Sequence, residues 1–172
     1  LVPSGTYPVD NPVAQVLGAE SLKVEKSRGF TLGVVWDALP NVTLTLDYYR
    51  LQVDDRIGLI ASHVDQAAVD ALNAAGYPDA DLLLGSAANF FGNAFDSDIH
   101  GWDFVVASRH EIGGGTLNVD FRHNYNRQDV ENVDTALVAG VETPLIDGGR
   151  QYDLENQVPR HRSTLTLDYG KG

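Results

Sequence analysis

The sequence contains no cysteine and no methionine, and the first absence excludes several kinds of chemistry. Without cysteine the chain cannot form a disulfide, use a thiolate nucleophile or hold zinc through thiolates. Basic residues are also scarce: 12 lysines and arginines stand against 24 aspartates and glutamates, which gives a net charge of -12. Because nucleic acids are polyanions, we do not expect an acidic chain without a cationic stripe to bind them.

Long apolar runs are absent as well. No run approaches the roughly 18 residues that a membrane-crossing helix requires, so a membrane role would have to be played by β-strands. The 172 residues suffice for one ordinary domain or for a piece of something larger. Because the chain starts at Leu1 without a signal peptide and stops directly after a strand-like segment, we expect an excised segment.

A hairpin with two different faces is the clearest pattern in the chain. Apolar and polar residues alternate through 101–111 and again through 116–126, and a period of two places successive side chains on opposite faces of a sheet. The glycines at 113–115 favour a tight turn between them, because glycine reaches positive φ without a Cβ clash. One face is apolar with aromatic ends, and the other carries charges and amides.

Other segments alternate in the same way, which predicts five strands in all. Their approximate ranges are 28–39, 42–53, 99–111, 116–126 and 160–169. Pro40 suits the short reversal between the first two strands. The alternation slips beyond Tyr49, which indicates a bulge or the point where the strand leaves its apolar surroundings.

The regions between the strands are less regular, and they contain one convincing helix. Alanines and a leucine at helical spacing predict it over 65–75. Ser62 or Asp65 can cap its N-terminus, and Gly76 followed by proline ends it. A shorter helical turn is expected around 13–17.

The lengths of the connections alternate. The turns at 39–41 and 112–115 are short, whereas the connections at 54–98 and 127–158 are long. In an up-and-down meander, alternate connections lie at the same end of the sheet. Outer-membrane barrels have this asymmetry, with short periplasmic turns and long extracellular loops. The strands have about the 9–11 residues that cross a bilayer at a tilt.

Aromatic residues fall near both ends of the apolar face. Trp36 and Tyr169 lie toward the short turns, while Tyr48, Trp102 and Tyr125 lie toward the long connections. Trp and Tyr favour membrane interfaces, so two such belts are typical of a bilayer-spanning sheet. The polar face would suit a wet lumen. The same alternation also occurs in soluble β-sandwiches, where the apolar face packs on a second sheet.

Two sets of polar residues have side chains that can ligate metal ions. The aspartates of the first long connection offer oxygen ligands for calcium, but EF-hand spacing is missing and solvated loop charge is the favoured interpretation. These residues are Asp54, Asp55, Asp96 and Asp98. The histidines have no zinc-binding spacing, and His110 and His123 do not converge across the glycine turn. The histidines are His63, His100, His110, His123 and His161.

The remaining motifs predict no catalytic residue and no cofactor. The glycines at 113–115 are not a phosphate loop, because no Lys-Ser/Thr and no helix follow them. There is no G-x-S-x-G elbow for a serine hydrolase. Residues 89–93 either contact a ligand or pack as an ordinary strand extension, and the helix at 65–75 either packs on neighbouring loops or gates a ligand.

Four motifs follow one another along the chain. They are Leu22-Lys23-Val24-Glu25-Lys26-Ser27 with Gly33, Leu44-Thr45-Leu46-Asp47-Tyr48-Tyr49-Arg50 with Asp55-Arg56-Ile57, Asn93 with Gly101-Trp102-Asp103, and Glu155 with Pro159-Arg160-His161-Arg162. Together they resemble passages of the TonB-dependent outer-membrane receptors, the second most specifically. In the first motif, Val24 stands where that family usually has proline.

The resemblance implies that residues 1–172 are an all-β, antiparallel meander from the C-terminal half of a transmembrane barrel of about 22 strands. It further implies a receptor in the bacterial outer membrane, in contact with the lipid bilayer. Such receptors bind a scarce nutrient, such as a ferric siderophore, and import it with energy from TonB through an N-terminal plug that this chain lacks. No enzymatic activity is expected. The alternative is a soluble all-β carbohydrate- or partner-binding module with an acidic surface.

Overall fold

The computed structural model describes residues 4–138 and 141–171, which divide into two compact units. The first unit comprises Leu1–Ser27, Val53–Ser97 and Val130–Tyr152. The second comprises Arg28–Gln52, Asp98–Asp129 and Asp153–Gly172. Four strands contribute residues to both units, and each unit is described by itself below.

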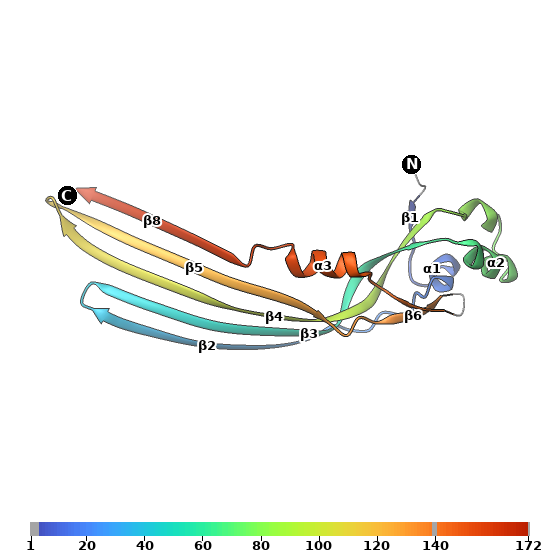
Figure 1. The fold of residues 1–172 in the computed structure, drawn as a ribbon, viewed down its shortest axis with the longest axis horizontal. Helices are drawn as coiled ribbons and strands as arrows, with labels where there is room; N and C mark the ends of the chain where they lie inside the picture. The colour runs from blue at the N-terminus through green and yellow to red at the C-terminus, as the bar shows by residue number, and fades with distance from the viewer. Residues whose placement is uncertain (1–3, 139–140, 172) are drawn as a thin grey trace. The chain divides into compact units, whose positions relative to one another are not determined.

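The second unit is a β-meander. Its strands are β2 (Lys26–Leu39), β3 (Val42–His63), β4 (Ala87–Ile112), β5 (Gly115–Glu131) and β8 (His161–Lys171). Their order in the sheet is β2-β3-β4-β5-β8, so each strand lies beside the preceding strand of the meander (Figure 1). β8 runs antiparallel to β5, with Gly115 opposite Lys171 and Tyr125 opposite His161. The predicted all-β meander is therefore confirmed.

Both tight turns fall where the sequence predicts them. Residues 40–41 join β2 to β3. Gly113 and Gly114 join β4 to β5 with φ values of 61° and 79°, and two successive positive φ angles are what a type I′ hairpin turn requires. The Tyr169 hydroxyl donates to the Ile112 carbonyl oxygen at 3.2 Å, which ties β8 to this turn.

One face of the second unit carries exposed apolar side chains. On β2 and β8 these are Phe30, Leu32, Val34, Trp36, Leu165, Leu167 and Tyr169. Aromatic rings continue the row across the sheet: Tyr48 lies 6.4 Å from Phe30 and 4.9 Å from Trp102, measured between ring centroids. An apolar surface of this extent indicates that something other than water covers it.

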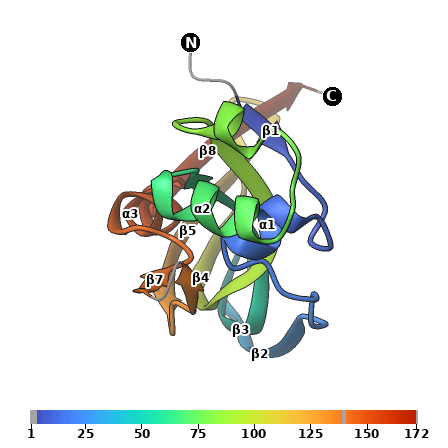
Figure 2. The same cartoon turned by 90° about the vertical axis from the view of Figure 1, so that its right-hand side faces the viewer.

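The first unit combines residues 53–63 of β3 and residues 87–97 of β4 with several small elements. These are β1 (Ser4–Thr6), α1 (Pro12–Val16), α2 (Gln66–Ala74), the 3₁₀ helix η1 (Ala80–Leu83), the β6 (Thr135–Val138) and β7 (Val141–Pro144) hairpin, and the start of α3 (Gly148–Asn156). β1 pairs in parallel with β4. Figure 2 shows α1 and α2 in this unit. Its buried core contains Val13, Leu17, Val64, Val69, Leu72 and Phe90.

The predicted helix at 65–75 is confirmed as α2. The Asp65 carboxylate accepts from the Ala68 N–H at 2.8 Å and caps the N-terminus. Gly76, with a φ of 77°, follows the C-terminus. Ser62 lies within β3 and is not the cap. In the described part of the chain, no helix has both the length and the apolar character needed to cross a bilayer.

The structure corrects the predicted long connections. β3 extends through the start of 54–98 and β4 occupies its end, from Ala87 onward. The buried face of this extension is formed by Ala88, Phe90, Gly92 and Ala94. The strand-extension interpretation of 89–93 is thus confirmed, although alanine and glycine contrast weakly in hydropathy with their neighbours and make the alternation hard to see in the sequence.

The second connection, 127–158, is also more ordered than expected. β5 continues to Glu131, and the β6–β7 hairpin and α3 follow. The expectation of one short helix in the long connections was therefore wrong, because α3 and η1 accompany α2, whereas α1 confirms the helical turn expected around 13–17. β6 and β7 have only four residues each, which is too short for a period of two to be distinguished from chance.

Candidate ligand-binding site

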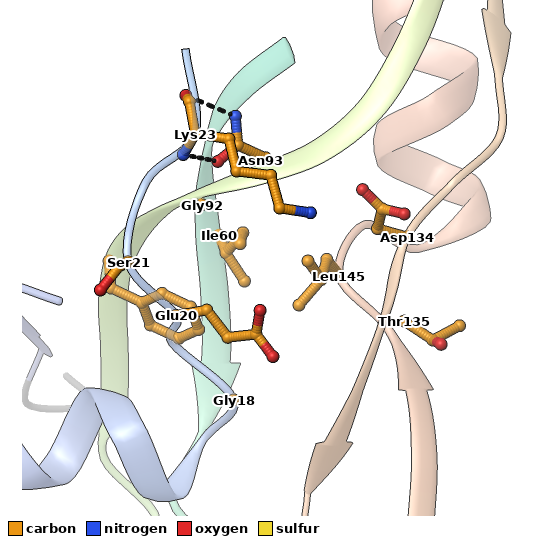
Figure 3. A pocket seen from close by; sticks show the side chains of 11 residues that line it. Gly18, Glu20, Ser21, Lys23, Ile60, Gly92, Asn93, Asp134, Thr135 and Leu145 are labelled. Atoms are coloured by element: carbon orange, nitrogen blue, oxygen red, sulfur yellow. Dashed lines mark hydrogen bonds between the residues drawn. The ribbon is translucent and has the colours of Figure 1, made fainter. Parts of the chain in front are cut away.

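The first unit contains a cavity of about 120 Å³ (Figure 3). It is lined by Gly18, Glu20, Ser21, Lys23, Ile60, Phe90, Gly92, Asn93, Asp134, Thr135 and Leu145. These residues come from the segment after α1, from β3 and β4, and from the region around β6. Three positions of the 89–93 stretch, which the sequence singled out, are among them.

Asn93 holds the segment after α1 against β4. Its Oδ1 accepts from the Lys23 N–H at 2.7 Å, and its Nδ2 donates to the Lys23 carbonyl oxygen at 3.1 Å. The side-chain amide thus pairs with both backbone groups of one residue, as a neighbouring strand would. With its backbone fixed, Lys23 extends its ammonium group toward the Asp134 side of the cavity (Figure 3).

The floor of the cavity is apolar. Phe90 is completely buried, and Ile60 is 4 % exposed. A Cβ atom on Gly92 would lie 2.6 Å from Ile60 Cδ1, so glycine at this position leaves room for the isoleucine in its present conformation. On the opposite wall, the Asp134 N–H donates to the Ala94 carbonyl oxygen at 2.9 Å and fixes the start of the β6 region on β4.

The rim of the cavity carries both signs of charge, from Lys23, Glu20 and Asp134. Such a rim offers donors and acceptors to a polar ligand group, while the floor receives an apolar one. Because pockets for drug-sized ligands measure about 300–1,000 Å³, this cavity is suited to one part of a ligand.

The aspartates considered for calcium are not gathered into one site. Asp55 has a φ of 57°, and its N–H donates to Asp96 Oδ1 at 2.9 Å. Asp96 Oδ2 accepts from Asn132 at 3.0 Å. Within the described residues, no group of three or more His, Cys, Asp or Glu is arranged to hold a metal ion.

Asp98, in the second unit, pairs with an arginine. Arg50 Nε donates to its two carboxylate oxygens at 3.2 and 2.8 Å, and Arg50 Nη2 makes a further short contact. His100 Nδ1 lies 3.6 Å from Asp98 Oδ1. The hydrogen bonds from Arg50 lower the pKa of the Asp98 carboxyl, although burial acts in the opposite direction.

Two of the five histidines meet in the second unit. The β5–β8 pairing brings the His123 and His161 rings to a centroid separation of 5.5 Å. Sequence reasoning compared His123 only with residues across the β4–β5 turn and missed this pair. The register of β8 against β5 would have found it, because that register places Tyr125 opposite His161 and Ser163 opposite His123.

The polar face of the second unit has a wider, open hollow of about 440 Å³. It is lined by Pro40, Asn41, Thr43, Ala107, Ser108, Arg109, Asn118, Val119, Asp120, Thr166 and Asp168. Further along this face, Asn124 Nδ2 donates to Asp103 at 2.8 Å and Asn126 Nδ2 donates to the Tyr49 hydroxyl at 2.9 Å. The polar face is thus cross-linked by side-chain hydrogen bonds.

Comparison with known proteins gives one result. The family model for the TonB dependent receptor-like β-barrel matches residues 3–172, which include both units. No curated protein and no solved structure matches the chain.

Proposed function

The chain belongs to the TonB-dependent receptor β-barrel family, and from this premise we propose that it helps to bind and import a ferric siderophore. The family is one of outer-membrane proteins, which places this protein in the bacterial outer membrane and removes the alternative of a soluble binding module. The role of the chain is to bind and admit the ligand without covalent chemistry. Energy from TonB would reach it through a plug domain.

The cavity in the first unit is the observation that supports ligand binding. This unit contains most of both connections that link β3 to β4 and β5 to β8. In outer-membrane barrels the long connections face the outside of the cell. We therefore assign the cavity rim, with Lys23, Glu20 and Asp134, to contact with an extracellular nutrient.

Charge narrows the class of siderophore. The chain has a net charge of -12, and an acidic surface repels polyanions over a distance of about 10 Å at ordinary salt. Ferric tris-catecholates carry several negative charges, whereas ferric hydroxamates are neutral or cationic. A hydroxamate chelate is therefore the ligand that the charge of this chain favours.

Uptake of radioactive iron tests this proposal. A strain without the receptor is complemented with wild-type protein, Lys23→Gln or Asn93→Ala, and is offered iron on a hydroxamate or on a catecholate siderophore. We expect TonB-dependent uptake of iron from the hydroxamate siderophore. In Asn93→Ala the segment around Lys23 is no longer held against β4, and we expect the affinity for the siderophore to fall about tenfold, which corresponds to a loss of about 1.4 kcal/mol of binding free energy.

Asn73→Ala is the matched control. Asn73 lies in the same unit and donates to Asp81 at 3.1 Å, but it does not line the cavity. Its uptake should equal that of the wild type. Surface labelling verifies equal amounts of each variant in the outer membrane. If removing the receptor changed uptake from neither siderophore, the ligand class would be wrong.

A further inference from the structure

Two imidazoles lie side by side where β8 begins, at the end of that strand away from the Gly113-Gly114 turn. His161 is the first residue of β8, and His123 lies on β5, diagonally across the pair. His161 Nδ1 is 3.4 Å from His123 Nε2, so the rings direct one nitrogen each toward the other. Residues on adjacent strands at a diagonal are close enough for long side chains to touch.

Ser163 orients one of these rings. His123 Nδ1 lies 2.8 Å from the Ser163 hydroxyl oxygen. When the hydroxyl accepts the proton of Nδ1, the lone pair of His123 Nε2 faces His161. Histidines that ligate metals nearly always make such a hydrogen bond through the second ring nitrogen, because it fixes the tautomer and the ring orientation. The Tyr125 ring, 5.0 Å from that of His161, supports the second imidazole.

The separation of the two nitrogens matches metal coordination. Two nitrogens each 2.0–2.1 Å from a tetrahedral zinc ion are roughly 3.3–3.4 Å apart. The observed distance is 3.4 Å, which is long for a hydrogen bond between two ring nitrogens. An ion bound by both nitrogens would lie off the line between them, so a rotation of each ring that keeps this separation would direct both lone pairs at the ion.

We propose that His123 and His161 bind a divalent transition-metal ion, Zn²⁺ or Cu²⁺, on the apolar face of the second unit. Imidazole suits both ions, and the remaining coordination positions are open to water because His161 begins β8, at the end of the strand where the lipid-covered face meets the aqueous side. This site is separate from the cavity, since neither histidine lines it. The proposal is independent of which nutrient the receptor imports.

The test is metal binding to the full-length protein, purified in detergent without a polyhistidine tag. Zn²⁺ alone is titrated by calorimetry, and Cu²⁺ alone is followed by electron paramagnetic resonance. We expect one site per chain and a Cu²⁺ spectrum with coupling to two nitrogens. His123→Asn and His161→Asn should each abolish the heat of Zn²⁺ binding. Each should also reduce the nitrogen coupling in the Cu²⁺ spectrum to one nitrogen or none.

Two further variants make the test specific. His63→Asn removes a histidine at the end of β3 and should bind both ions like the wild type. Ser163→Ala keeps both ligands but removes the orienting hydroxyl, so we expect affinity to fall by about tenfold or more. The proposal is overturned if wild-type protein shows no saturable binding at millimolar Zn²⁺, or if the double variant His123→Asn/His161→Asn binds as well as the wild type.

Discussion

Asp98 shows how a single polar residue depends on its partners. Its side chain is only 5 % exposed, whereas the guanidinium of Arg50 is 49 % exposed. Hydrogen bonds from Arg50 lower the pKa of the Asp98 carboxyl. A carboxyl whose folded pKa is depressed stabilises the fold above its unfolded pKa, and this contribution is lost as the pH falls through the folded pKa.

We therefore predict that Asp98→Asn destabilises the protein at neutral pH by about 1 kcal/mol, a value kept low because the arginine is half exposed. The difference from wild type should shrink below about pH 4, where the unpaired carboxyl of the unfolded chain is protonated. Urea unfolding of the membrane-inserted protein at neutral and acidic pH measures this difference.

Asp129→Asn serves as the comparison for that prediction. Asp129 also accepts from an arginine, Arg127, at 2.9 Å, but its side chain is 31 % exposed. Because exposed pairs contribute little, we expect a change below about 0.5 kcal/mol at either pH. Equal losses in the two variants would show that burial of Asp98 does not strengthen its pair.

The sequence shows which residues have the chemistry to form a site, but it does not show which residues they contact in the fold. Asn93 and His161 both stood in motifs that the sequence singled out. The backbone that Asn93 holds lies 70 residues away, and the partner of His161 lies 38 residues away. A contact between strands depends on register, and a pattern with a period of two leaves register undetermined without the neighbouring turn.

At the scale of elements, close packing between strands depends on glycine. A Cβ atom on Gly101 of β4 would lie 2.2 Å from the Tyr125 carbonyl oxygen and 2.5 Å from the Tyr49 hydroxyl. Tyr49 can therefore lie across β4 and accept a hydrogen bond from Asn126 of β5. One aromatic side chain thus connects three strands on the polar face.

Replacing Gly101 with alanine should disturb this connection. We predict that Gly101→Ala destabilises the folded barrel by about 1–3 kcal/mol, the usual cost of adding a methyl group to a closely packed site. Gly170→Ala is the matched control, since a Cβ at Gly170 of β8 meets nothing within 4 Å. Samples of each variant are heated to increasing temperatures and run on a gel, where the folded protein migrates as a compact form. The temperature at which this form is lost measures the stability of both variants. An unchanged Gly101→Ala would contradict the predicted clash.

The central parts of the strands were predictable because apolar and polar residues alternate there, which reflects the two different faces of the sheet. All five predicted strands correspond to strands of the meander, and the capped helix corresponds to α2. The extension of β4 from Ala87 was harder to predict, because its buried face consists largely of small residues. The cavity was not predictable, since its lining comes from five separate stretches of the chain.

For the whole molecule, the two faces of the second unit require different solvents. The exposed side chains of Trp36, Leu165 and Leu167 lie on one face, and the hydrogen-bonded network around Tyr49 lies on the other. In the outer membrane, we expect lipid to cover the first face and water or protein to cover the second. The same chain is thus stabilised by its surroundings as well as by its own core.

This arrangement predicts where the two tryptophans lie. Trp36 is close to the 40–41 turn, and Trp102 is close to the opposite end of the unit, where β4 leaves it. In receptor variants that keep either Trp36 or Trp102 as the only tryptophan, brominated acyl chains should quench the fluorescence most when bromine lies near the interface, because indole prefers that depth. A headgroup quencher added only outside the cell should act on Trp102 and spare Trp36, since short turns face the periplasm. The reverse result would invert the assignment of the long connections to the cell exterior, and absence of acyl-chain quenching would show that the apolar face is covered by protein.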